Sequence, residues 1–436
     1  MTNHPDPLGS YETQPLWRAQ MPAVPSYRDR PLPDEADVVV VGGGYTGMSA
    51  ARQLARQGAL VTVVEANELG FGASTRNGGI VHPGYKWGPD ELTKRYGEDT
   101  GRALFRETLD GYRFLKQLIL DEQIEADFIE RGHLELAYAP AHIGALQAEQ
   151  RALADAGVEC SFVPRERLRE EIGSDAYHGA LAFEGSGGIH PGRYFAGLLA
   201  AADRAGADLH EGVRATAVRP QGDGRTLVET ERGSILARDV VVATNGYTDG
   251  LVPPLRRRVI PIGSYIIATE PLSEATAREL SPKGRVFFDT KNFLYYWRLT
   301  ADRRMVFGGR ASFIPTTVDQ TARILHRGLV EVHPQLRDAR IDYAWGGTLA
   351  FTFDRMPHVG RMGGVTYALG CCGTGVVLMT HLGFKVAEWL GGGPPPIVAR
   401  LRFPLVPAPY EGRPWFLPVV GEWYRLKDRL AERGRR

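Results

Sequence analysis

Three glycines, Gly42, Gly44 and Gly47, form a G-x-G-x-x-G motif with the composition of a phosphate-binding turn. The first glycine permits a tight turn, the second lets the main chain approach a pyrophosphate, and the third lets a helix pack closely on a strand. The N–H groups that begin the following helix would then face the phosphate. Glu65 lies 18 residues past Gly47, where a carboxylate can accept hydrogen bonds from ribose hydroxyls. The spacing predicts a dinucleotide site without saying which dinucleotide binds. The motif also contains Tyr45 and Thr46.

A second glycine-rich stretch, GFGASTRNGGIVHPG (70–84), begins five residues after Glu65. Its hydrogen-bonding side chains are Ser74, Thr75, Arg76 and Asn77. The hydroxyls can bind phosphate oxygens, and the guanidinium or the amide could contact the polar edge of a ring or a substrate. Gly78 and Gly79 let the main chain lie against a flat ring. An ordinary surface loop is the alternative, but a flavin site has a use for such a loop and a plain NAD site has none.

Two later stretches have the same small-residue character. VVVATNG (240–246), with Ala243 and Thr244, is typical of a buried strand that breaks at small residues. GCCGTG (370–375) opens a helix, and its N–H groups could face an anion or the electron-rich edge of a reduced flavin. Each can also be a plain strand–turn. Together with the first two motifs they indicate one ligand held from both ends of the chain.

The elements that would position these residues begin with a βαβ unit: a strand at Val38–Val41, a helix at Met48–Arg56 and a strand at Leu60–Val64. We predict an α/β fold with a Rossmann-like, glutathione-reductase-type nucleotide domain, interrupted by an α+β substrate domain with a mainly antiparallel sheet. The predicted ranges are 1–33 for an N-terminal arm, 34–90, 175–250 and 340–395 for the discontinuous nucleotide domain, 91–174 and 251–339 for the substrate domain, and 396–436 for a C-terminal arm.

Composition limits the function classes. The net charge of +1 gives no field that draws the whole chain to nucleic acid. Three cysteines, an odd and low number, favour a reducing compartment and no metal cluster. We read no transmembrane run and no signal peptide, and therefore expect a cytoplasmic enzyme with no integral membrane segment.

The sequence resembles the flavin amine oxidase (DAO) family, which includes D-amino acid oxidase, glycine oxidase and sarcosine oxidase. The resemblance spans about residues 34 to 395 and rests on VVVVGGGYTG, VVEA, GASTRNGG, VVVATNGY and GCCGTGVVLMTHLG. Within the family, the Arg-Asn-Gly-Gly run in GASTRNGG is most similar to the gamma-glutamylputrescine oxidoreductase branch.

The resemblance implies a bound FAD. It places Gly42, Gly44 and Gly47 at the pyrophosphate, Glu65 at the adenosine ribose, Val213 against the adenine, Ser74, Thr75 and Arg76 near the pyrophosphate and ring, and Gly373, Thr374 and Gly375 beside the flavin. Some relatives attach FAD through Cys or His, but the loop after Glu65 has no His before His82 and the segment WGGTLAFTFDRMPHVG has no Cys, so non-covalent FAD is expected. Sarcosine oxidases carry a lysine over the flavin that promotes reaction with oxygen. The strand RRMVFGG has no lysine there, which leaves oxygen or another acceptor open.

The implied reaction moves a hydride equivalent from the carbon beside an amine to flavin N5, and water then hydrolyses the imine. On the substrate side, strand periodicity in FLYYWRLT puts Tyr296 and Arg298 on one face, and Arg298 could bind a substrate carboxylate. His82 is the other catalytic candidate. An aromatic core with a solvated arginine is the alternative interpretation. A D-amino acid, glycine or sarcosine substrate is the alternative within enzymes, and an RNA-modifying flavoprotein domain or a non-catalytic flavin subunit is less favoured.

Overall fold

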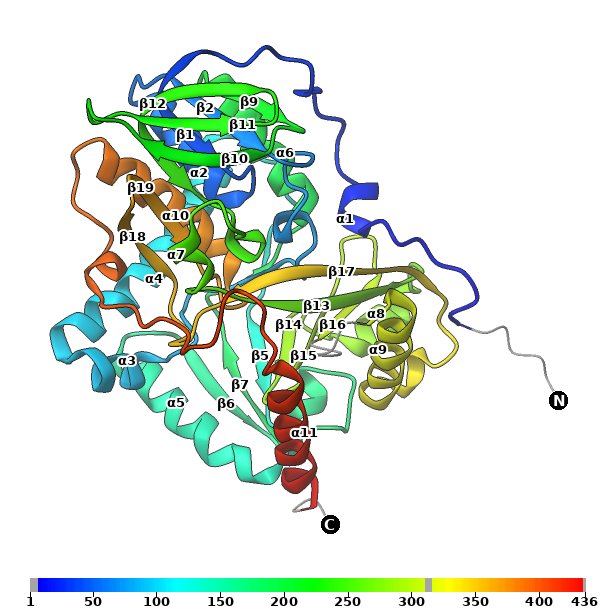
Figure 1. Cartoon of the computed structure of the whole chain (residues 1–436). Coiled ribbons are helices and arrows are strands. Elements are labelled where there is room, and N and C mark those ends of the chain that lie inside the picture. The colour runs from blue at the N-terminus through cyan, green and yellow to red at the C-terminus, as the bar shows by residue number, and fades with distance from the viewer. Residues whose placement is uncertain (1–6, 310–315, 434–436) are drawn as a thin grey trace.

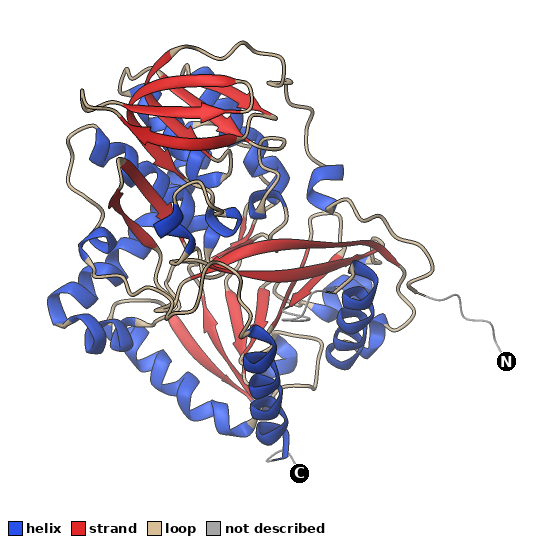
Figure 2. Ribbon diagram, in the orientation of Figure 1, coloured by secondary structure: helices blue, strands red, loops and turns tan. Residues whose placement is uncertain are grey.

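The computed structural model describes residues 7–309 and 316–433, and its two large sheets lie in separate halves of the molecule (Figures 1 and 2). The first sheet has the order β10-β11-β12-β1-β2-β9, with β19 beside β12 and β18 beside β19. Its strands are β1 (Glu35–Val41), β2 (Val61–Glu65), β9 (Asp208–Glu211), β10 (Ala215–Pro220), β11 (Thr226–Thr230), β12 (Gly233–Val242), β18 (His358–Met362) and β19 (Val365–Leu369).

The centre of this sheet is parallel, because β1 pairs in parallel with both β2 and β12. Val38 and Val40 of β1 belong to the core that includes helix side chains, while Val39 and Val41 belong to the core on the opposite face. A strand buried on both faces needs such a continuous run of β-branched residues. The helices that pack around this half are α2 (Tyr45–Arg56), α4 (Glu98–Asp121), α6 (Pro191–Arg204) and α10 (Gly375–Leu390).

The second sheet has the order β17-β13-β16-β15-β14-β5-β7-β6 and is antiparallel except where β14 lies parallel to β5. Its strands are β5 (His133–Leu136), β6 (Cys160–Pro164), β7 (Gly179–Phe183), β13 (Ile260–Thr269), β14 (Val286–Asp289), β15 (Tyr295–Leu299), β16 (Met305–Gly309) and β17 (Ile341–Phe351). α9 (Val318–Val332) packs against β13, β16 and β17, and α5 (Ile143–Asp155) packs against β6 and β7.

Smaller elements complete the described part of the chain. A three-stranded sheet has the order β3-β8-β4. The remaining bounds are β3 (Ile80–Val81), β4 (Ile129–Glu130), β8 (Gly187–Gly188), α1 (Leu16–Ala19), α3 (Pro89–Tyr96), α7 (Pro253–Arg256), α8 (Glu274–Leu280) and α11 (Leu417–Arg433), with short 3-10 helices at Ala73–Thr75, Pro140–His142, Arg165–Glu170, Asn245–Tyr247, Pro334–Leu336 and Ile397–Arg400.

The predicted α/β class and the antiparallel second sheet are present, and two borders differ from the sequence-based ranges. β7 and β17 lie in the second sheet, although both fall in ranges assigned to the nucleotide domain. The reason is pairing: β7 lies between β5 and β6, and β17 pairs along its length with β13. The C-terminal arm contains the 17-residue helix α11. The division into domains stays a prediction.

Candidate active site

A cavity of about 410 Å³ is lined by residues of both halves of the molecule, a size usual for cofactor and ligand sites. Its wall begins at Val41, where β1 ends, and continues to Met379 on α10. At one end it is bordered by Glu65 and Val213, and at the other by His82, Tyr296 and residues of the second sheet. We call these the nucleotide end and the substrate end.

The start of α2 borders the cavity, and its N-cap residue has no side chain of its own to cap the helix. Gly44 is the N-cap residue and has an extended backbone, and the Tyr45 N–H is bound by Ser74 Oγ at 2.9 Å. A Cβ added to Gly44 would come within 2.9 Å of the same hydroxyl and meet no other atom within 4 Å, so a side chain there would push on Ser74 and occupy space at the cavity. The remaining N–H groups of the first turn point where an anion is favoured by the helix dipole.

The other two glycines of the motif act on packing. Gly42 has φ of +107°, and a Cβ on it would lie 2.9 Å from the Ala243 carbonyl oxygen. A Cβ on Gly47 would lie 1.9 Å from the Gly42 carbonyl oxygen, which no side-chain movement relieves. Gly42 lines the cavity, whereas Gly47 does not. Gly47 therefore supports the site from behind, by letting α2 approach β1.

Glu65 closes the nucleotide end. Its Oε2 accepts a hydrogen bond from the Gly43 N–H at 2.8 Å, and its Oε1 accepts one from the Asn67 N–H at 2.9 Å. Two backbone donors thus fix the carboxylate at the end of β2, where it lines the cavity with its remaining lone pairs. A fixed carboxylate suits a ribose hydroxyl.

The loop after Glu65 is shaped by its own side chains. Arg76 donates from Nε to the Phe71 carbonyl at 2.8 Å and from Nη1 to the Gly346 carbonyl at 3.1 Å. Asn77 donates from Nδ2 to the carbonyls of Ala73 and Ser74, both at 3.0 Å. Arg76, Asn77 and Gly78 line the cavity, but these bonds show that the guanidinium and the amide also hold the loop in place.

A second uncapped helix start lies at the cavity where α10 begins. Thr374 is the N-cap residue, yet its hydroxyl donates to the Cys371 carbonyl at 3.2 Å rather than capping the helix. Gly373 and Gly375 line the cavity beside Cys372, and Thr374 does not. Burial raises the pKa of the Cys372 thiol to about 12, so the thiol stays protonated and is not a nucleophile.

The substrate end is built from side chains of distant segments. Tyr296 of β15 shares a hydrogen bond of 2.9 Å with Ser264 of β13, joining their hydroxyls. Lys86 and His82 approach from the segment after the glycine-rich loop, and apolar walls come from Phe288, Leu294 and Phe351. A Cβ on Gly373 would lie 3.7 Å from Lys86 Nζ, which places this ammonium beside the start of α10.

His82 is a neutral group at this end. Burial is the main cause that lowers its pKa to about 4, and the charge of Lys86 lowers it further. The ring places Nδ1 at 2.9 Å from the Pro83 carbonyl, which favours the tautomer that donates from Nδ1. Nε2 then carries the lone pair and can accept a hydrogen bond.

Arg298 does not reach the cavity, and this differs from the expected carboxylate clamp. Arg298 lies on the predicted face of β15, since Tyr295 and Trp297 pack in the core on the other face of the sheet. However, its guanidinium is buried and donates to the carbonyls of Gly78, Leu299 and Ile189. Three carbonyls hold the cation behind the loop, so Arg298 positions Gly78.

The N-terminal arm crosses the outside of the same loop. Trp17 of α1 is fully buried and donates from Nε1 to the Asn77 carbonyl at 2.6 Å. Arg18 donates to Thr75 Oγ1 at 3.1 Å and to the Leu69 carbonyl at 2.9 Å. Thr75, which does not line the cavity, thus binds the arm instead.

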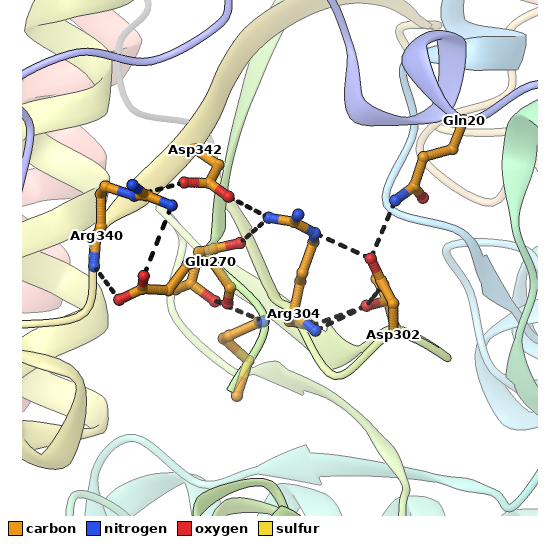
Figure 3. Close-up of polar contacts among 9 residues, drawn as sticks. Gln20, Glu270, Asp302, Arg304, Arg340 and Asp342 are labelled. Atoms are coloured by element: carbon orange, nitrogen blue, oxygen red, sulfur yellow. Dashed lines mark hydrogen bonds and ion pairs between the residues drawn. The ribbon is translucent and has the colours of Figure 1, made fainter. Parts of the chain in front are cut away.

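We call residues 17–20 of the N-terminal arm the strap. The end of the strap is anchored on the second sheet by an ionic network (Figure 3). Gln20 donates to Asp302 Oδ2 at 3.0 Å, and Arg304 joins Asp302 to Asp342. Arg340 extends the chain of contacts through Asp342 Oδ1 at 2.8 Å. The strap therefore ties the loop at the cavity to the ends of β16 and β17.

Most of the sequence-predicted residues meet at this cavity. Those that line it are Gly42, Gly44, Tyr45, Thr46, Glu65, Ser74, Arg76, Asn77, Gly78, His82, Val213, Ala243, Thr244, Tyr296, Gly373 and Gly375; those that do not are Gly47, Thr75, Arg298 and Thr374. Lining residues missed from the sequence include Lys86, Ser264, Phe288, Leu294, Phe351 and Cys372. A possible signal for Lys86 was its place just after the glycine-rich loop. Cys372 lies within GCCGTG and Leu294 within FLYYWRLT, whereas Ser264, Phe288 and Phe351 lie in no motif identified from the sequence.

Two searches of the described residues were negative. No group of three or more His, Cys, Asp or Glu residues in the described ranges could hold a metal ion. No helix in the same part of the chain is long and apolar enough to cross a membrane.

Comparison with known proteins places the chain in a family. The profile of the family described as "DAO: FAD dependent oxidoreductase" matches residues 37–389. The chain is 36% identical to gamma-glutamylputrescine oxidoreductase of Escherichia coli over 402 residues, which are 91% of this chain and 93% of that one. It is 26% identical to glycine oxidase of Pseudomonas aeruginosa over 75% of this chain and 86% of that one.

Solved structures agree at the level of the fold. Glycine oxidase from Geobacillus kaustophilus matches with a TM-score of 0.72 at 20% identity, covering 85% of this chain and 100% of that chain. L-proline dehydrogenase from P. horikoshii matches with a TM-score of 0.70 at 21% identity, covering 84% and 96%.

Proposed function

The chain belongs to the DAO family of FAD-dependent oxidoreductases, and we propose that it oxidises the C–N bond of an amine of the gamma-glutamylputrescine kind. The observation that carries this substrate class is the likeness to the Escherichia coli enzyme over nearly the whole of both chains. A glycine, sarcosine or D-amino acid substrate is the second candidate, favoured by the likeness to glycine oxidases.

The residues at the cavity fit FAD. Gly44 leaves open the space that a Cβ would fill beside Ser74, and α2 starts there without a side-chain cap. We propose that this helix start holds the pyrophosphate, with Glu65 at the ribose and Val213 at the adenine. Gly373 and Gly375 at the start of α10 would hold the flavin ring. Non-covalent attachment is in keeping with the protonated thiol of Cys372.

When bound, FAD supplies a two-electron acceptor for the substrate C–H bond. The chain's own residues orient the substrate and exclude water. The apolar side chains Phe288, Leu294 and Phe351 wall the substrate end, and Tyr296 offers a hydroxyl already held by Ser264. With a pKa of about 4, His82 Nε2 accepts a hydrogen bond without taking a full proton near neutral pH.

Lys86 brings positive charge to the substrate end. A positive charge there favours a neutral amine over an ammonium group, because like charge lowers the pKa of the ammonium. A neutral amine is the form that can give up a hydride equivalent. The same charge attracts the carboxylate of a gamma-glutamyl group, a role that Arg298 cannot fill from behind the loop.

An anaerobic titration tests the proposal. The FAD-loaded protein is mixed with gamma-glutamylputrescine, sarcosine, glycine and D-alanine in parallel, and the flavin absorbance band is followed. We expect gamma-glutamylputrescine to bleach the band at the lowest concentration. Bleaching by sarcosine, glycine or D-alanine but not by gamma-glutamylputrescine would reject the first candidate substrate class in favour of the second. A stable band with all four compounds would reject both candidates while leaving the family intact.

A further inference from the structure

The C-terminal helix α11 carries an outward apolar stripe. Its members lie four, three and four residues apart and therefore share one helix face. They are Val419 (73% exposed), Trp423 (55%), Leu426 (47%) and Leu430 (55%), and Trp415 (62%) lies just before the helix. Large apolar side chains that gather at such exposure mark an interaction surface, whereas single ones do not.

The opposite face of α11 is docked on the second sheet. Asp428 Oδ1 accepts hydrogen bonds from the Asn292 N–H at 3.0 Å and from Asn292 Nδ2 at 2.8 Å, and its Oδ2 accepts one from the Phe293 N–H at 3.1 Å. The Arg425 guanidinium lies over the Phe293 ring, 5.2 Å from its centre. The helix is therefore held to the body through one face while its stripe is exposed, and it lies at the periphery of the molecule near the C-terminus (Figure 1).

Charge is concentrated in the same stretch of the sequence. Residues 425–436 include six basic and two acidic residues, a net charge of +4, whereas the whole chain has +1; the rest of the chain therefore has +1 − 4 = −3. One of the two acids, Asp428, is turned inward to Asn292. Lys427 lies over the Trp423 ring, 5.2 Å from its centre, so a cation directly borders the stripe.

We propose that α11 docks the protein on an anionic lipid surface. A helix that combines a Trp- and Leu-bearing face with flanking Lys and Arg residues binds in the plane of a membrane interface, through apolar burial and attraction to acidic headgroups. Phe293, which the helix holds, directly precedes Leu294 in the wall of the substrate end. The docked face of α11 therefore contacts the residue next to this wall of the cavity.

A second copy of the chain is a less suitable occupant. Pairing two α11 helices along their stripes would bring together two basic flanks, which repel each other. Glu422 is the acid next to the stripe, and it is already ion-paired with Arg425 of its own helix.

Vesicle flotation of the full FAD-loaded chain tests the proposal. Vesicles of phosphatidylcholine alone are compared with vesicles of phosphatidylcholine mixed with phosphatidylglycerol. We expect binding to the mixed vesicles, and loss of most of it near 1 M NaCl, where the Debye length is about 3 Å. The double variant Leu426→Glu, Leu430→Glu should bind at least about tenfold more weakly, because each leucine loses its apolar burial.

A matched control uses an exposed leucine elsewhere. Leu120 on α4 is 69% exposed, and Leu120→Glu should bind vesicles as the unaltered chain does. The flavin absorbance of every variant reports that the body is folded. Equal binding to the two vesicle types, binding to neither, or unchanged binding by the double variant would overturn the proposal. Light scattering could also overturn it. If the unaltered chain had the mass of two chains and the double variant had the mass of one, the stripe would be a self-association surface.

Discussion

The two ends of the cavity are built from different parts of the polypeptide. The nucleotide end is made largely of main chain: glycines, the start of α2 and a carboxylate fixed by two N–H groups. The substrate end is made of side chains that come from β13, β14, β15, β17 and the segment after the glycine-rich loop. Main chain suits a ligand with constant phosphates and rings, whereas side chains can change singly with the substrate. Substitutions should therefore divide into those that remove flavin and those that alter turnover.

The largest effect is expected from Gly44→Val, because the new side chain fills the space beside Ser74 at the start of α2. FAD affinity should fall by at least about 100-fold, equivalent to about 2.7 kcal/mol. The flavin-to-protein absorbance ratio of the purified variant measures this. Gly222→Val is the matched control, since a Cβ on Gly222 meets nothing within 4 Å, and it should keep full flavin. Stoichiometric flavin in Gly44→Val would break the assignment of the nucleotide end.

The next effect is expected from Glu65→Gln, which replaces the charged acceptor at the end of β2. Hydrogen bonds to charged groups contribute about 1.5–3 kcal/mol, so FAD should bind roughly 10- to 100-fold more weakly. The substrate KM of the fully reloaded variant should stay unchanged. A changed KM with unchanged FAD affinity would show that Glu65 acts on the substrate and not on the cofactor.

At the substrate end, Lys86→Met should keep stoichiometric flavin and lower kcat/KM about tenfold, because the positive charge at the reacting end is lost. Lys86→Arg, which keeps the charge, should restore part of the activity. Steady-state kinetics with gamma-glutamylputrescine measure both variants. Loss of flavin from Lys86→Met would show that the two ends are not separable.

The smallest effect is a pH dependence of stability that belongs to the substrate end. His82 has a folded pKa of about 4 against an ordinary value of 6.5, so the unfolded chain takes up the proton first as pH falls. The stability given by the neutral ring is complete above pH 6.5 and is lost as pH falls from 6.5 towards 4. Between pH 7 and pH 5, the free energy of unfolding of His82→Asn should therefore fall by about 1–2 kcal/mol less than that of the unaltered chain, as measured by denaturant unfolding. An equal loss in both proteins would contradict the buried, neutral His82.

The contrast between the two ends also explains what sequence can predict. The nucleotide end depends on backbone conformation over short spans, and Gly42, Gly44 and Glu65 reveal it by spacing alone. The substrate end depends on which strands pair. Ser264 reaches Tyr296 only because β13 and β15 both flank β16, and no local pattern encodes that.

Arg298 shows the limit most clearly. Strand periodicity correctly placed it on the face of Tyr296, but periodicity does not say what lies above that face. The loop at Gly78 covers it, and three carbonyls bind the guanidinium. The two faces of the 17-residue helix in the C-terminal arm likewise cannot be told apart from the sequence, since the stripe and the docked face become distinct only once Asp428 is seen to bind Asn292.

The cavity wall runs from Val41 to Met379, and this has a consequence for how the protein is made. At usual rates of translation, Gly42 and Gly44 leave the ribosome on the order of tens of seconds before α10 exists. The strap of Trp17 and Gln20 also waits, because its partners at Asn77 and Asp302 are made later. A nascent or truncated chain that ends before α10 lacks one wall of the site. Flavin colour in a preparation is thus a signature of chains that were synthesised through to the last helix of the nucleotide half.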